Sequence, residues 1–176
     1  QRMQAQLLAR ITREHEVAAE NLRIRIALDN VSTGVMIADA GRTVIYANDA
    51  VKRILKGAEA DIRKQLPSFD AERMLGQNID GFHKNPKHQA DLLARFTSPY
   101  VANLEVGGRH LMVTANPVIT PDGQRVGSVA EWRDRTGEVL AQREVGSLVE
   151  AAAAGDFERR ISLDGKEGFF REIADG

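Results

Sequence analysis

The order of the strand-like segments limits what this chain can fold into more than any other feature of the sequence. Two short runs rich in β-branched residues, "GVMIADA" and "RTVIYAN", come first, and Ala40-Gly41 between them suits a turn. A mostly helical stretch follows. Three further strand-like runs complete the segment: "YVANLEV", "HLMVTANPVI" and "QRVGSVAEWRD". The sequence therefore predicts an α+β fold, a five-stranded antiparallel sheet with short helices on one face.

The helical stretch is divided by residues that commonly start and stop helices. It predicts four short helices, in "NDAVKRILKG", "EADIRKQL", "DAERMLG" and "PKHQADLLARF". Gly57 and Gly76 are the expected stops. The expected starts are Asn48, Asp61 or its neighbours, Asp70 and Pro86.

Longer amphipathic helices are predicted on both sides of this domain. Residues 1–28 lack Gly and Pro, and apolar residues recur there at three- or four-residue multiples: Met3, Leu7, Ile11, Ala18 and Leu22. A second apolar face, with Val145, Leu148 and Ala152, lies in the helix expected from residue 137. The first stripe is thin, so we expect a partner helix to bury it and the flanking helices to join two copies as a homodimer. The predicted parts are a linker helix at 1–28, a domain at 29–136, and an output segment at 137–176.

Composition excludes several classes of protein. The 176 residues include no cysteine, which excludes disulfides, thiolate metal sites and cysteine-adduct photochemistry. A formal net charge of −1 gives no electrostatic reason to expect nucleic acid or an anionic membrane. The sequence contains neither a membrane-spanning run nor a signal peptide. No arrangement typical of an enzyme emerges, so we do not expect an enzyme. We expect a cytoplasmic piece of a longer protein.

Small residues at inward positions of the strands predict a pocket. Side chains alternate along a strand, so placing Trp132 inward also places Ser128 and Ala130 inward. The inward residues expected on the neighbouring strands are Tyr100, Ala102 and Leu104, then Leu111, Val113 and Ala115. Interiors seldom tolerate voids, and a bound molecule would fill this one. The alternative is that the short helices pack closer onto the sheet.

One of the four histidines is placed where it could bind a ligand. His83, in "NIDGFHKNP", precedes the helix start at Asn85-Pro86, so we expect it on a tight turn at the pocket edge, with Ile79 and Phe82 beside it. It is a solvated loop residue, a structural histidine or a ligand to a bound group. By contrast, His15 and His88 lie on predicted solvated helix faces.

The opening "NVSTGVMIADAGRTVIYANDA", the closing "GSVAEWRDRT" and the order of elements resemble a PAS domain, a sensor module common in bacterial receptors and kinases. The resemblance covers roughly residues 27–136. Asp134-Arg135-Thr136 is similar to the Asp-x-Thr motif with which PAS domains pass from the last strand to an output helix, which implies signal-relay roles for Asp134 and Thr136. We expect the Thr136 hydroxyl to cap that helix and Glu138 to lie in its first turn; an ordinary helix start is the alternative.

The tail resembles a second signalling module. "AAAAGDFERRISLDGKEGFFREIADG" is similar to the connector and second helix of a HAMP module, with Gly155-Asp156-Phe157, Arg160-Ile161 and Glu167-Gly168-Phe169 in the usual order. A PAS domain followed by HAMP with no membrane segment between them resembles the soluble aerotaxis-type methyl-accepting chemotaxis receptors. The helix at 1–28 would then be a linker or the end of a preceding HAMP.

The stretch "IDGFHKNP" resembles the one that supplies the axial histidine in the haem-binding PAS domains of those receptors. The resemblance implies a non-covalent b-type haem with His83 as axial ligand to the iron. It also implies that the Trp132 N–H points at a bound diatomic gas: oxygen in the first place, or carbon monoxide or nitric oxide. The pocket residues would be Ile79, Phe82, Tyr100, Leu104, Leu111, Val113 and Ala130, with Lys84, Arg95 and His110 as candidates for a haem propionate. A flavin- or metabolite-binding PAS domain and a cofactor-free relay or dimerisation module are the alternatives.

Overall fold

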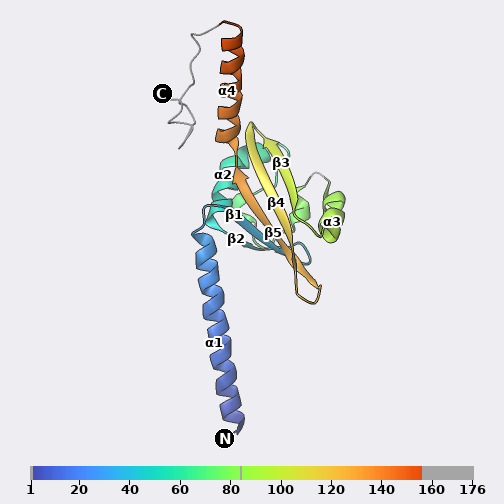
Figure 1. Ribbon diagram of the computed structural model, residues 1–176. Helices are drawn as coiled ribbons and strands as arrows, with labels where there is room; N and C mark the ends of the chain where they lie inside the picture. Colours follow the sequence, from blue (N-terminus) through green and yellow to red (C-terminus); the bar gives the residue numbers. More distant parts are fainter. Residues whose placement is uncertain (1, 84, 156–176) are drawn as a thin grey trace.

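A five-stranded antiparallel sheet with the order β2-β1-β5-β4-β3 forms the centre of the molecule (Figure 1). The computed structural model describes residues 2–83 and 85–155. The central pair is β1 and β5, which joins the first hairpin to the last three strands. The strands are β1 (Gly34–Asp39), β2 (Val44–Ala47), β3 (Tyr100–Val106), β4 (Arg109–Ile119) and β5 (Arg125–Asp134). The predicted α+β fold with an antiparallel five-stranded sheet is confirmed.

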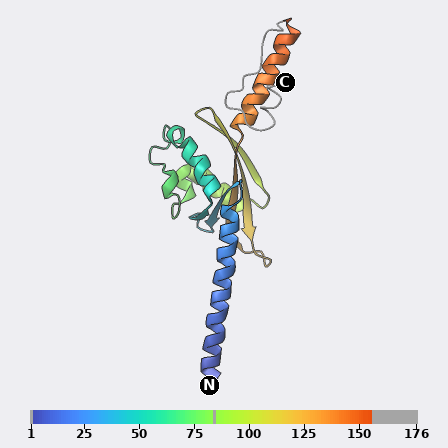
Figure 2. The same ribbon diagram turned by 90° about the vertical axis from the view of Figure 1, so that its left-hand side faces the viewer.

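The helices between β2 and β3 lie on one side of the sheet, as Figure 2 shows for the teal and green segments. Asn48, Asp70 and Asn85 are N-caps whose side chains accept hydrogen bonds from backbone N–H groups, which confirms three of the predicted starts to within one residue. The helices are α2 (Asp49–Ile62), the 3-10 helices η1 (Ala71–Arg73) and η2 (Ile79–Phe82), and α3 (Pro86–Arg95).

The predicted stop at Gly57 and the predicted start at Asp61 or its neighbours are wrong, because α2 continues through Gly57 and contains Asp61 in its last turn. Leu55 and Ala58, on either side of Gly57, are both buried, so continuing the helix buries its apolar face on both sides of the glycine. A Cβ at Gly57 would lie 3.5 Å from Nη2 of Arg109.

Two long helices, α1 (Arg2–Asp29) and α4 (Thr136–Ala153), leave the domain in opposite directions (Figures 1 and 2). No residue of α1 is buried. Its end is held by Tyr46, whose hydroxyl donates to Oδ1 of Asp29 at 2.8 Å; burial and this hydrogen bond raise the pKa of Tyr46 to about 12. Among the described residues, no helix is both long and apolar enough to cross a membrane. The HAMP-like stretch from Asp156 onward lies outside the described residues.

The core lies between the sheet and α2 with η1, and a buried asparagine fastens it to the end of α1. Eight buried side chains form the core: Met36, Val44, Ala47, Val51, Leu55, Phe69, Ala71 and Met74. Asn48 is completely buried. Its Oδ1 accepts from the N–H groups of Val35 and Val51 at 2.8 and 3.0 Å. Its Nδ2 donates to the carbonyls of Leu28 and Thr33 at 2.8 and 3.0 Å. One side chain therefore joins α1, β1 and α2.

Candidate functional site

A cavity of about 520 Å³ lies between the helical layer and the inner faces of β3, β4 and β5. Small-molecule sites in proteins commonly measure roughly 300–1,000 Å³ and are mostly apolar, so this cavity has an ordinary size for one. The predicted residues that line it are Phe82, His83, Tyr100, Ala102, Leu104, Leu111, Val113, Ala115 and Trp132.

Two predicted pocket residues lie elsewhere. Ile79 and Ala130 do not line the cavity; both pack against the buried core cluster. Ala130 pairs with Met36 of β1 and Ala115 of β4, so it lies in the centre of the sheet, under the core rather than under the cavity. The inward face of β5 therefore divides between two environments, and Trp132 is the β5 residue that reaches the cavity.

His83 is held in one ring orientation by a backbone carbonyl. It is the C-cap of η2, and its Nδ1 lies 2.7 Å from the carbonyl oxygen of Ile79. A carbonyl only accepts hydrogen bonds, so Nδ1 carries the hydrogen and the lone pair of the neutral ring is on Nε2. Histidines that bind metals usually have their second ring nitrogen fixed in this way. The half-buried imidazole at the cavity wall thus has the tautomer that an Nε2 ligand to iron requires.

Trp132 brings an unsatisfied donor to the same cavity. Its indole Nε1 is buried, and no group among the described residues accepts its hydrogen. Leaving a buried donor without a partner costs roughly 1–3 kcal/mol, so native structures seldom do so without a reason. A polar atom of a bound molecule would satisfy it. The residues present therefore fit a haem with a gas ligand: one imidazole free to bind iron and one N–H donor, in an apolar cavity.

Part of the cavity wall is formed by residues outside the predicted set. Ile62, Leu66 and Phe69 contribute from the end of α2 and the segment after it, and Phe69 meets Phe82 edge-on with ring centroids 5.6 Å apart. The signal for them was present, since Leu55, Ile62, Leu66 and Phe69 recur at helical multiples.

Of the remaining candidate ligands, those among the described residues do not line the cavity. His15 and His88 are exposed, as is Arg95. His110 lies at the start of β4, where its backbone N–H donates to the Thr136 hydroxyl at 2.9 Å. Lys84 lies outside the described residues. Among the described residues there is also no group of three His, Asp or Glu side chains placed as metal ligands.

The hydroxyl of Thr136 does not cap α4, so that prediction is wrong. The N-cap is Arg135, without a side-chain capping bond. The Thr136 hydroxyl is used elsewhere, because it donates to Oδ1 of Asp134 and accepts from the His110 N–H. Asp134 also accepts from the Thr136 N–H at 2.9 Å and from Nη1 of Arg109 at 3.1 Å. The junction between β5 and α4 is therefore tied to the start of β4.

Glu138 lies in the first turn of α4, as predicted. It pairs with Arg135 at 2.8 Å, and this hydrogen bond lowers the pKa of the Glu138 carboxyl below its ordinary value. A carboxylate in the first turn is also favourable for the helix dipole.

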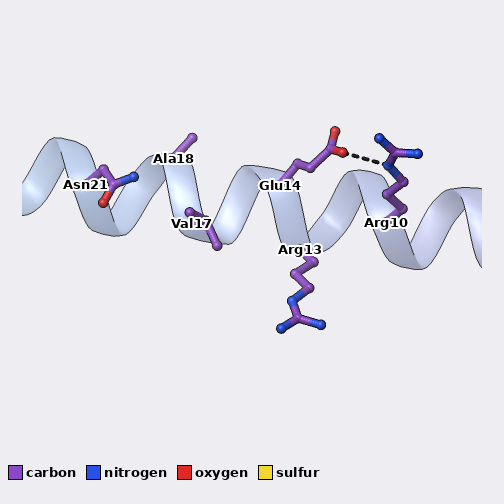
Figure 3. Close-up of a pocket in the computed structure, with 6 residues that line it drawn as sticks. All are labelled: Arg10, Arg13, Glu14, Val17, Ala18 and Asn21. Carbon is purple, nitrogen blue, oxygen red and sulfur yellow. Dashed lines mark hydrogen bonds and ion pairs between the residues drawn. The ribbon is translucent and has the colours of Figure 1, made fainter. Parts of the chain in front are cut away.

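Of two further depressions that involve α1, the one drawn in Figure 3 is shallow. It is lined by residues of one helix only: Arg10, Arg13, Glu14, Val17, Ala18 and Asn21. The Arg10–Glu14 ion pair at 2.8 Å is highly exposed, and such pairs contribute little. Nothing here converges on a ligand.

Comparison with known proteins agrees with the fold. A family model described as a PAS domain matches residues 22–87. Over 157 residues the chain is 54% identical to the methyl-accepting chemotaxis protein McpB of Pseudomonas aeruginosa, a match that covers 89% of this chain and 23% of that receptor.

Solved structures give the same result. One is the Aer2 receptor of Vibrio cholerae, described as a dual PAS-haem oxygen sensor, with 29% identity and a TM-score of 0.52 over 58% of this chain and 93% of that chain. The PAS domain of Bordetella pertussis BvgS has 18% identity and a TM-score of 0.50 over 76% of this chain and 98% of that one, which shows the fold alone. The chain therefore has the PAS fold, carried between two long helices.

Proposed function

We propose that this chain is the sensory part of a chemotaxis receptor, which binds a b-type haem through His83 and detects a diatomic gas, oxygen in the first place, beside Trp132. The observation that carries the proposal is the convergence of two groups on one cavity: an imidazole with its Nδ1 engaged, and a buried indole N–H without an acceptor. The similarity to McpB and to the Aer2 haem sensor supports it.

The residues that line the cavity have different roles in this proposal. When bound, haem would supply an iron that can bind a diatomic gas. His83 offers its Nε2 lone pair, and the carbonyl of Ile79 keeps the ring from turning. The apolar side chains of the lining exclude water and so strengthen any hydrogen bond made inside. Trp132 would offer its N–H to a gas that carries partial negative charge, which would favour oxygen over carbon monoxide.

The signal would leave along β5. Asp134 follows Trp132 by two residues, and its carboxylate holds both the first residue of α4, Thr136, and Arg109 of β4. A change at Trp132 that shifts β5 would therefore move the start of α4, and with it the HAMP-like segment that follows. This is a two-state coupling in which the ligand favours one position of the helix.

Haem content tests the proposal. The protein, expressed with ample haem supply, should contain one b-type haem per chain in a pyridine haemochrome assay. His83→Ala should lose most of it, whereas His88→Ala and His110→Ala should leave the Soret band nearly unchanged. A haem content near zero would overturn the proposal: a flavin spectrum would then favour a redox sensor, and a colourless protein a relay module.

A further inference from the structure

The segment that carries His83 is hydrogen-bonded to the β1–β2 turn. The Ile79 N–H donates to the carbonyl of Arg42 at 2.9 Å, and the Asn78 side chain donates to the carbonyl of Gly41 at 3.1 Å. Just before them, the Val44 N–H donates to the carbonyl of Gln77 at 2.9 Å. The turn and the entry to η2 thus behave as one unit, although they are far apart in the sequence.

Arg42 adds a side-chain bond to this unit. Its Nε donates to both carboxylate oxygens of Asp80, at 2.9 and 3.0 Å. The two side chains are only 32% and 20% exposed, so water screens this pair less than it screens a surface pair. Asp80 is the residue after Ile79 and lies within η2.

The backbone of Arg42 is in an unfavourable conformation. Its φ of 66° is in the left-handed region, and no other non-glycine residue among those described has a positive φ. Glycine adopts this conformation without steric cost, but here the turn has the left-handed backbone at Arg42 and not at the preceding Gly41. Backbone strain at residues other than glycine clusters at functional sites, which makes Arg42 a candidate for a functional role.

We infer that Arg42 is the residue that positions the His83 imidazole, an inference that rests on the proposed haem site. Arg42 holds Ile79 from two directions, through its own carbonyl at the Ile79 N–H and through its guanidinium at the adjacent Asp80. The carbonyl of Ile79 then accepts the Nδ1–H of His83. The direction of the Ile79 carbonyl, and through it the orientation and tautomer of the imidazole, is set by Arg42.

Two variants test this without removing the turn. Arg42→Gly suits the φ of 66° and removes the whole side chain with its guanidinium while keeping the backbone carbonyl, and Asp80→Asn removes the charge from the other partner at constant shape. Arg73→Gln is the control, because the Nε of Arg73 in η1 lies 3.7 Å from the Asp70 carboxylate in a pair whose arginine side chain is 84% exposed. Groups that orient a metal-bound histidine commonly change affinity ten- to a hundredfold when lost.

Three measurements follow. In the haem-free protein, nitrogen NMR of the histidine rings, assigned with His83→Ala, should show one Nδ1–H tautomer at His83 in the wild type and in Arg73→Gln. A mixture of tautomers is expected in Arg42→Gly and Asp80→Asn. In the haem-loaded protein, these two variants should release haem about tenfold faster and shift the iron–histidine stretching frequency.

The outcomes separate this inference from the proposed function. A wild type that binds no haem would overturn the proposed site, while the haem-free tautomer measurement would still decide whether Arg42 orients His83. If the wild type binds haem and both variants keep the wild-type tautomer, stretching frequency and release rate, Arg42 is a turn residue only and the inference is wrong.

Discussion

Trp132 of β5 lies opposite Gly34 of β1, and a Cβ at Gly34 would be 3.0 Å from the Cβ of Trp132 and 3.0 Å from the Cα of Val51. A glycine at this position therefore lets β1, β5 and α2 approach closely. The absence of a side chain at Gly34 leaves the space that Trp132 needs beside β1.

Gly34→Ala should destabilise the domain by about 1–3 kcal/mol, because an extra methyl group in this contact forces strand and helix apart. Urea unfolding followed by Trp132 fluorescence would measure the loss. The control is Gly146→Ala in α4, where a Cβ meets nothing within 4 Å and alanine favours the helix. Equal stability of wild type and Gly34→Ala would show that α2 can shift without cost.

Asn48→Ala should destabilise the protein by roughly 2 kcal/mol or more. The change removes an N-cap and leaves the buried N–H of Val35 and the carbonyls of Leu28 and Thr33 without their partner. Asp70→Ala is the comparison, since it deletes an exposed cap on the short helix η1 and should cost about 0.5–1 kcal/mol. Denaturant midpoints of both variants check the difference. Similar losses would mean that Asn48 acts as a cap only.

The sheet and the approximate helix starts could be predicted because they follow from local patterns. Alternation in the β-branched runs gave the strands, and capping residues gave the starts. Gly57 and Thr136 were misjudged because tertiary packing decides their roles. Burial of Leu55 and Ala58 against the core favours a helix that continues through Gly57, and the Thr136 hydroxyl accepts from the His110 N–H.

Local patterns also predicted one part of the candidate site and missed another. His83, Trp132 and the wall formed by β3 and β4 follow from turn position and strand alternation. The cavity residues from α2 and the segment after it would have been found from their helical spacing, which strand alternation does not reveal. Ala130 was assigned to the cavity because strand alternation does not show where the core ends and the cavity begins. Arg42 had no local signal: its partner Asp80 is 38 residues away, and the left-handed backbone appears only in three dimensions.

The exposed apolar residues of α1 lead to a prediction about assembly. Leu7 and Ile11 are 58% and 40% exposed, and we propose that α1 pairs with α1 of a second copy. Ile11→Glu should raise the dimer dissociation constant at least about tenfold, because burying an isoleucine contributes about 1.5–3 kcal/mol. Sedimentation equilibrium measures it. Ala9→Glu, on the opposite side of the helix at 3.6 residues per turn, is the control. Equal dissociation constants for both variants would contradict pairing through this stripe.

Trp132→Leu separates a role in gas binding from a role in packing. Leucine keeps an apolar side chain but removes the N–H, which is buried and has no acceptor among the described residues. A hydrogen bond to a partly charged ligand in a dry cavity contributes about 1.5–3 kcal/mol, so the oxygen dissociation constant should rise roughly ten- to a hundredfold. Carbon monoxide gains less from such a bond and should change much less. Equilibrium titration of the haem-loaded protein with each gas measures both constants.

Trp132→Phe is the control, because phenylalanine keeps an aromatic ring between Gly34 and Val113 but has no donor. If the N–H is what matters, it should show the same selective loss of oxygen affinity as leucine. Stability should fall by only about 1–3 kcal/mol in either variant, since the change is one of volume at a half-buried residue. If both gases weakened together in both variants, Trp132 would be shaping the cavity. A different donor in the lining, such as the Tyr100 hydroxyl, would then have to stabilise oxygen.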